Sequence, residues 1–144
     1  NGGIEPSGYS DDYNTAANTI TISEEGNSCG YVSYITTNFW RGGHCYAAFE
    51  KSIIYKIFLF QILKYKESEI MALRVGSGLP NIQIKPLEKF KLTIPSLDEQ
   101  KAIAEVLSEA DNEIAIADRK PTALRTQKRA LMQQLLTGKK RLKR

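Results

Sequence analysis

The sequence predicts an α+β fold, in which a small mixed α/β domain with a twisted β-sheet (residues 1–95) precedes a helical coiled-coil segment (residues 96–144). Within the first 50 residues, short β-branched runs alternate with turns rich in Gly, Asn and Ser, a pattern typical of strands joined by loops. Apolar residues then recur at heptad spacing near the C-terminus. A length of 144 residues suits one domain with a helical appendage.

Three strands are predicted at residues 18–23, 31–37 and 44–49. The turn-forming residues 24–30 join the first two strands as a hairpin, and the third extends the sheet. Residues 76–80 form a turn, because Gly frees the backbone and Pro80 disfavours helix in the residue before it. Two further strands, at 81–84 and 90–94, complete the predicted domain.

Two helical regions are predicted. Ser52 caps a helix over 53–65, whose apolar side chains occupy most of its circumference, as in a buried helix. Ser96 and Glu99 match a capping box that begins a second helix, and Gly138 is placed to end it. Because Pro121 costs about 3 kcal/mol inside a helix, we expect a break or kink at 118–121 or near 110–112.

An apolar seam runs along the second helical region. Steps of four and three residues from Ile103 give a seam that only Pro121 and Lys128 interrupt. Such a seam requires another helix against it. The residues assigned to helix packing and dimerisation are Ile103, Leu107, Ile114, Leu124, Leu131 and Leu135.

Charge is separated into blocks along the chain, whose formal net charge is +4. Acidic and basic residues balance at nine each through residue 97, whereas residues 98–118 hold seven acidic residues and one lysine. Residues 119–144 hold ten basic residues and no acid. Antiparallel packing of the two blocks, within or between chains, sets opposite charges side by side, and the basic tail is also suited to phosphate contacts.

The two cysteines, Cys29 and Cys45, are too few for a disulfide scaffold, so we expect a reduced, cytoplasmic setting. The most apolar run, 53–63, is far shorter than the roughly 20 residues needed to cross a bilayer. Membrane insertion is therefore not expected. The chain begins at Asn1 without an initiator Met, which suggests an engineered, processed or fragmentary chain.

Two stretches carry a resemblance to a known family. Residues 92–104 (LTIPSLDEQKAIA) and 128–139 (KRALMQQLLTGK) resemble the helix entry and closing segment of the specificity (S) subunits of type I restriction-modification systems. Residues 19–30 and 39–46 are similar to one variety of the family's target-recognition domain. The chain thus resembles one target-recognition domain (1–95) plus one conserved helical spacer (96–144), about half of a full subunit.

The resemblance implies a subunit that binds a bipartite double-stranded DNA target without altering it. It also implies tethering of two methyltransferase (modification) subunits and, in the full complex, an endonuclease/translocase subunit. S-adenosylmethionine and ATP would belong to these partners, so we expect no cofactor or metal in this chain. A half-length chain can be completed by a second copy or by a second S-subunit half, and two copies would recognise a palindrome.

Candidate DNA-binding residues fall in three loops. In the first, Glu25, Asn27 and Ser28 lie in a turn whose backbone can approach phosphate, and Asn27 can pair with an adenine edge. In the second, Arg41 suits guanine or phosphate and His44 follows it. Arg74, Ser77 and Lys85 surround the third turn. A hairpin turn, an arginine stacked on Trp40 and a solvated loop are the respective alternatives.

Two other classes of function stay open. A truncated coiled-coil assembly or decoy module would bind methyltransferase subunits without DNA selectivity. A small zinc enzyme would use Cys29, His44 and Cys45, but three candidates with adjacent His44 and Cys45 lack the usual ligand spacing. We therefore expect those cysteines to pack as small apolar residues.

Overall fold

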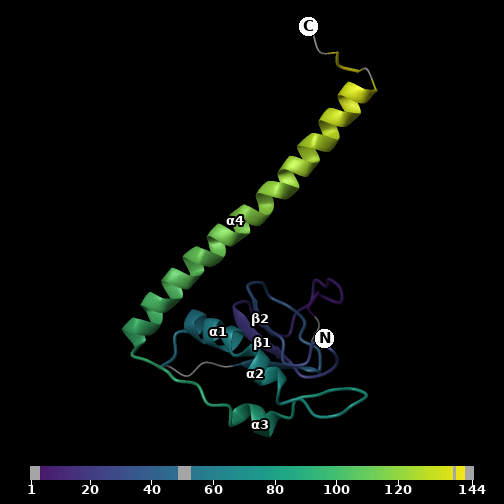
Figure 1. Cartoon of the computed structure of the whole chain (residues 1–144). Helices are drawn as coiled ribbons and strands as arrows, with labels where there is room; N and C mark the ends of the chain where they lie inside the picture. The colour runs from purple at the N-terminus through teal and green to yellow at the C-terminus, as the bar shows by residue number, and fades with distance from the viewer. Residues whose placement is uncertain (1–3, 49–52, 138, 142–144) are drawn as a thin grey trace. The chain divides into compact units, whose positions relative to one another are not determined.

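The computed structural model describes residues 4–48, 53–137 and 139–141, and Figure 1 shows its α+β fold. The predicted fold class is confirmed. The elements, in chain order, are β1 (Thr19–Ser23), β2 (Val32–Ile35), β3 (Cys45–Ala48), α1 (Lys56–Tyr65), α2 (Glu67–Met71), α3 (Ile84–Glu88) and α4 (Leu97–Leu136). The chain forms two compact units, 1–104 and 105–144, so the first eight residues of α4 belong to the first unit.

The sheet has three antiparallel strands in the order β2-β1-β3. The central strand β1 places Ile22 opposite Val32 on one side and Tyr46 on the other. Because side chains alternate across a strand, Ile20 and Ile22 enter the core while Thr21 and Ser23 lie on the opposite face, buried but polar. The three predicted strands are confirmed. The first and third begin one residue later than predicted and the second is shorter at both ends, whereas the predicted end of the third, Phe49, lies outside the described residues.

The hydrophobic core lies between the apolar sheet face and the helices. β1 and β2 contribute isoleucine and valine side chains, α1 contributes two leucines, and the segments after α1 contribute two more isoleucines. The buried members are Ile20, Ile22, Cys29, Val32, Leu59, Leu63, Ile70 and Ile82. Tyr34 and Phe60 add a ring contact between β2 and α1, with centroids 5.5 Å apart.

Two side chains bind the outer edge of β2 where the strand begins. The Val32 amide donates to Glu67 Oε2 at 2.8 Å, and Lys64 Nζ donates to the Val32 carbonyl at 3.1 Å. Lys64 and Glu67 also pair with each other, and Lys64 Nζ lies 3.9 Å from the centre of the Tyr31 ring. The first outward-facing backbone groups of β2 are therefore hydrogen-bonded without another strand.

Two predicted strands are wrong. At 81–84, only Asn81 forms bridges, to Glu25 and Val75, and the chain then turns into α3 at Ile84. Pro86 is tolerated there because the first turn of a helix needs no amide from it. Residues 90–94 form no strand, although Phe90 and Leu92 pack on the core. Their alternation reflects burial against the core in a segment that pairs with none of the described strands.

The helix α1 starts later than expected. Its N-cap is Tyr55, which makes no side-chain capping bond, and the predicted cap Ser52 lies outside the described residues. Its end at Tyr65 agrees with the prediction. The short helices α2 and α3 were not predicted, since five residues carry too little periodicity to identify a helix.

The start of α4 is built into the first unit. The Glu99 amide donates to Ser96 Oγ at 3.4 Å, which is the hydrogen bond that the serine of a capping box accepts. Gln100 and Ala104 are each only 1% exposed. The Gln100 side chain accepts from the Tyr55 amide at 2.8 Å and donates to the Pro95 carbonyl at 2.9 Å and the Ile53 carbonyl at 3.2 Å.

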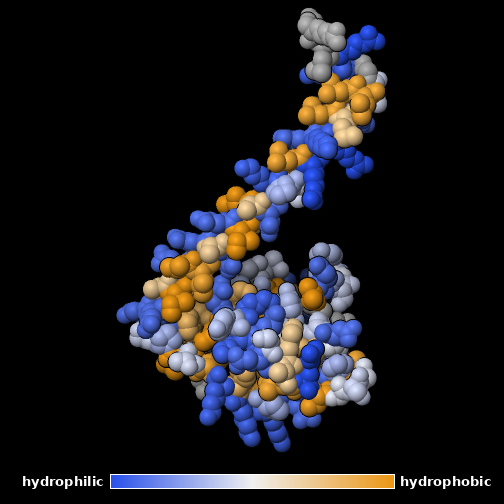
Figure 2. All heavy atoms as spheres, viewed as in Figure 1, coloured by the Kyte–Doolittle hydropathy of each residue, from blue (hydrophilic) through white to orange (hydrophobic). Residues whose placement is uncertain are grey.

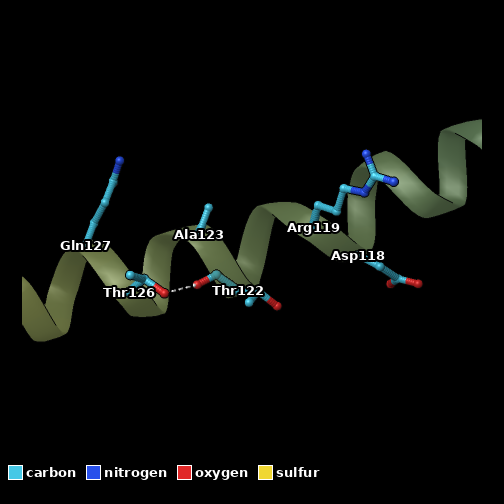
Figure 3. A pocket seen from close by; sticks show the side chains of 6 residues that line it. All are labelled: Asp118, Arg119, Thr122, Ala123, Thr126 and Gln127. Atoms are coloured by element: carbon cyan, nitrogen blue, oxygen red, sulfur yellow. Dashed lines mark hydrogen bonds between the residues drawn. The ribbon is translucent and has the colours of Figure 1, made fainter. Parts of the chain in front are cut away.

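Beyond Ala104, α4 continues to Leu136 and passes through Pro121. The expected break is therefore wrong at both places, whereas a kink stays a prediction. A break would free up to four amides and four carbonyls, whereas continuing leaves only the Ala117 carbonyl without its usual donor. Figure 3 shows six side chains around this turn, lining a shallow groove that belongs to one helix, with Thr126 Oγ1 donating to the Thr122 carbonyl. The predicted C-cap Gly138 lies outside the described residues.

Most seam residues of α4 are exposed in the single chain. Leu107 is 40% exposed, Ile114 59%, Leu124 56% and Leu131 54%, whereas Ile103 and Leu135 are half-buried. Apolar atoms are visible along this helix in Figure 2. Across the described ranges, no helix combines the length and the apolar character needed to span a bilayer.

Candidate functional site

Three loops meet at the end of the sheet where β1 ends and β2 and β3 begin. The loop 24–30, which joins β1 to β2, is bound from both sides. Its Glu24 amide donates to the His44 carbonyl at 3.2 Å, and its Glu24 carbonyl accepts from the Ile82 amide at 2.9 Å. The Gly26 amide donates to the Pro80 carbonyl at 2.9 Å. We call this meeting point of residues 24–30, 41–44 and 74–82 the loop edge.

Two predicted site residues contact each other at the loop edge. His44 Nδ1 lies 2.6 Å from Glu25 Oε2, although the residues are 19 positions apart in the sequence. The His44 side chain is 64% exposed and that of Glu25 26%. The carboxylate therefore fixes one ring nitrogen while much of the imidazole stays open to solvent.

The base of the loop edge is a partly buried hydrogen-bonded cluster. The Tyr46 hydroxyl lies 2.8 Å from Glu24 Oε1 and 2.9 Å from the Ile82 carbonyl oxygen. Burial, followed by the Glu24 carboxylate, raises the pKa of Tyr46 to about 12, so the phenol stays protonated at neutral pH. Cys29 Sγ donates to the Glu24 carbonyl at 2.9 Å. This cluster holds Glu24 inward and leaves its neighbour Glu25 for His44.

The loop edge also presents exposed neutral and basic side chains. Asn27 is exposed, and no other described residue bonds its side chain. Ser28 is half-buried, with its hydroxyl 3.5 Å from that of Ser23. Because Asn81 bridges to both Glu25 and Val75, the turn that contains Ser77 lies beside the loop 24–30. Arg74 acts electrostatically on Cys29 and is itself exposed.

Arg41 is anchored more firmly than a surface arginine. Its Nη1 donates to the Cys45 carbonyl at 2.6 Å, and its backbone exchanges hydrogen bonds with the Asn14 side chain at 2.7 and 3.0 Å. Its Nε is buried without a partner among the described residues. Trp40 is 62% exposed, and within the described chain no cation–π contact joins the two side chains.

A groove next to the loop edge was missed by sequence reasoning. Its floor is the polar face of the sheet, including Thr21, Ser23 and Ser33, and its walls come from segments 4–10 and 36–42, with Tyr31 and Phe39. The signal for the floor is present in β1, where Thr19, Thr21 and Ser23 alternate with isoleucines. The walls depend on chain segments that fold back from a distance, which local patterns do not reveal.

Of the eight predicted DNA-binding residues, seven gather at the loop edge: Glu25, Asn27, Ser28, Arg41, His44, Arg74 and Ser77. Lys85 lies on α3 and is exposed, and among the described residues no contact links it to this edge. Their role in DNA binding remains a prediction.

The cysteines and the histidine do not assemble a metal site in the described parts of the chain, where no group of three or more His, Cys, Asp or Glu side chains is placed to hold an ion. Cys29 and Cys45 are buried, and burial raises the pKa of both thiols. His44 is occupied by Glu25 instead.

Comparison with known proteins gives consistent matches. The family described as type I restriction modification DNA specificity domain matches residues 1–126. The type I restriction enzyme MjaVIII specificity subunit of Methanocaldococcus jannaschii is 35% identical over 88 residues, which cover 61% of this chain and 21% of that protein. The crystal structure of an S subunit from a type I restriction-modification system of M. genitalium aligns with a TM-score of 0.70 and 33% identity. That alignment covers 77% of this chain and 30% of the other, so the chain spans less than a third of these relatives.

Proposed function

Because the chain belongs to the type I restriction-modification DNA specificity family, we propose that it recognises one half of a bipartite double-stranded DNA target and scaffolds methyltransferase subunits. Specificity subunits are the non-catalytic part of type I complexes. In this proposal residues 1–95 recognise DNA in the cytoplasm, residues 96–144 are the spacer, and the endonuclease/translocase subunit joins the full complex.

The observation that carries the DNA-binding half of the proposal is the convergence of three loops at one end of the sheet. Exposed Asn27 supplies an amide that can pair with an adenine edge, and Arg74 with Ser77 supplies donors for phosphate. The loop backbone is bound to residues 44 and 80–82, so the backbone that carries Asn27 is held before DNA arrives. Preorganised donors lose less entropy on binding.

The exposed seam of α4 supports the scaffolding half. Four leucine and isoleucine side chains are 40–59% exposed along one helix, and helices seldom leave such a stripe in water. A helix of 40 residues is about 60 Å long at about 1.5 Å per residue. That length is sufficient to separate two recognition domains by more than one DNA turn, about 34 Å.

The DNA-binding proposal predicts that Asn27→Ala weakens binding to a selected target about 5- to 100-fold, the effect of losing one bidentate base contact. Duplexes would be selected from a random-sequence pool by the chain together with a methyltransferase subunit, and affinities measured by fluorescence anisotropy. Arg41→Ala is expected to weaken binding as well. Asn112→Ala, also exposed but in the middle of α4, is the matched control.

No sequence preference for wild-type protein, with methyltransferase binding retained, would favour the alternative of a coiled-coil assembly or decoy module. Equal losses for Asn27→Ala and Asn112→Ala would remove Asn27 from the recognition surface without removing the function.

The scaffolding proposal predicts a solution mass of about twice 16.2 kDa by light scattering. Replacing Leu124 and Leu131 by aspartate is expected to return the chain to a monomer and to abolish recruitment of the methyltransferase subunit, because charge is placed in the apolar seam. Thr126→Asp with Gln133→Asp, on a different face of the same helix, should keep the dimer. A wild-type monomer would instead mean that another S-subunit half covers the seam.

A further inference from the structure

We infer, on the basis of the DNA recognition proposed above, that His44 is a DNA-contacting residue, that Glu25 is its positioning residue, and that the contact forms when the imidazole is protonated. The acceptor is an electron-rich atom of the duplex, either a phosphate oxygen or the N7/O6 edge of guanine. DNA binding by this chain therefore takes up a proton.

The contact between the two side chains fixes the ring. With His44 Nδ1 2.6 Å from Glu25 Oε2, Nδ1 must carry hydrogen, because a carboxylate only accepts. Both residues are held by their backbones: Glu25 bridges to Asn81, and the His44 carbonyl accepts from Glu24. The remaining ring nitrogen, Nε2, belongs to a side chain that is 64% exposed, and in the described structure it bonds no other residue.

The protonation state of the His44 ring determines whether Nε2 offers DNA an acceptor or a donor. With a neutral ring, Nε2 is an acceptor and the pair carries the negative charge of Glu25, so it repels phosphate. With a protonated ring, Nε2 becomes a donor and the pair is neutral overall. Only the second state can bind the acceptor atoms of a duplex, so DNA selects it by mass action.

The other charged groups on the segments around the pair have interactions of their own. From the same loop, the Glu24 carboxylate is bound by Tyr46 of β3. From the 41–44 segment, Arg41 is bound to the Cys45 carbonyl. From the 74–82 segment, Arg74 acts on Cys29. Glu25 is thus the acidic group in direct contact with His44, and the two arginines supply positive charge at the same edge.

His44 is the single histidine of the chain, so one substitution removes every imidazole from it. Histidine is the side chain that ordinarily gains charge between about pH 5 and 8.

The experiment measures affinity for the selected duplex and for a scrambled duplex between pH 6 and pH 8, by anisotropy, with the full chain and its methyltransferase subunit. Wild-type affinity is expected to rise about tenfold from pH 8 to pH 6. His44→Gln, which keeps a donor but does not titrate, should flatten this profile, with His44→Asn as a second variant. Glu25→Gln should reduce the slope while overall fold and melting temperature are kept. Asn112→Ala, which is exposed in the middle of α4, should keep the wild-type slope.

Comparison of the selected and scrambled duplexes distinguishes the two acceptors, a phosphate oxygen and a guanine base edge. Loss of the slope on both duplexes assigns a phosphate, since phosphate contacts carry no sequence information, whereas loss on the selected duplex alone assigns a base edge. Identical profiles for wild type and His44→Gln would overturn the inference while leaving DNA recognition intact. An undiminished slope in Glu25→Gln would overturn the positioning role of Glu25. Absence of selective binding by wild type at every pH would instead overturn the proposed function.

Discussion

Replacement of Gln100 by alanine is expected to lower the free energy of unfolding by about 3 to 5 kcal/mol, through loss of three hydrogen bonds in a site that is 1% exposed. The truncation leaves the Tyr55 amide and the Pro95 and Ile53 carbonyls without their partner. Each partly buried hydrogen bond contributes about 0.5–1.5 kcal/mol net, and the cavity left by a side chain that is 1% exposed adds to the loss. Urea denaturation followed by the fluorescence of Trp40, the single tryptophan, measures the change.

The matched control is Gln133→Ala, an exposed glutamine on the same helix, for which we expect a change within about 0.5 kcal/mol. Gln100→Glu adds a chemical test of the amide itself. A carboxylate keeps the shape of the side chain but cannot donate to Pro95 and Ile53, so it should destabilise nearly as much as alanine at neutral pH. A loss below about 1 kcal/mol for Gln100→Ala would contradict the buried hydrogen-bond arrangement.

Replacement of Gly30 by alanine is the second large expected effect, about 3 kcal/mol or more. Gly30 has φ +90°, which costs an L-residue about 1–2 kcal/mol. A Cβ there would lie 2.8 Å from Met71 Cγ and 2.9 Å from Met71 Cα, so the backbone of α2 must move. Overpacking of this kind costs about 1–3 kcal/mol.

Two other glycines separate these contributions. Gly26 also has a positive φ, +82°, but a Cβ there meets nothing within 4 Å, so Gly26→Ala should show only the backbone cost. Gly43 has neither feature and should show almost no change. The expected order of destabilisation in urea is Gly30, then Gly26, then Gly43. Equal losses at Gly30 and Gly26 would mean that α2 shifts freely to accept the added carbon.

Local signals in the sequence predicted much of this fold. The alternation in residues 19–23, the turn at 24–30 and the Ser96 cap each depend on neighbours in sequence, and each is present. The failures depend on distant partners. Residues 90–94 alternate as a strand does, yet the burial of Phe90 and Leu92 against the core explains that pattern without a ladder. The low helix propensity of proline also led to a wrong expectation at Pro121. One missing backbone hydrogen bond inside the helix costs less free energy than the unsatisfied backbone groups of two new helix ends.

In the candidate site, too, local features could be predicted from the sequence and contacts between distant residues could not. Loop residues could be identified by composition, but the pairing of Glu25 with His44 joins positions whose strands meet only in the folded sheet. Gln100 lies in the stretch that carries the family resemblance, and its contacts with residues 53–55 and 95 give that glutamine a structural reason. Nothing in the sequence alone indicates that α1 begins next to it.

The pair of side chains on the edge of β2 has a consequence for solubility. A sheet edge with free backbone groups can recruit strands from other molecules and so begin aggregation. At Val32 the Glu67 carboxylate and the Lys64 ammonium occupy both groups, and they do so with charges that a neighbouring chain would have to desolvate before it could add a strand. The same two side chains that pack α1 and α2 against the sheet thus also act as a barrier to polymerisation of the recognition fold at this position.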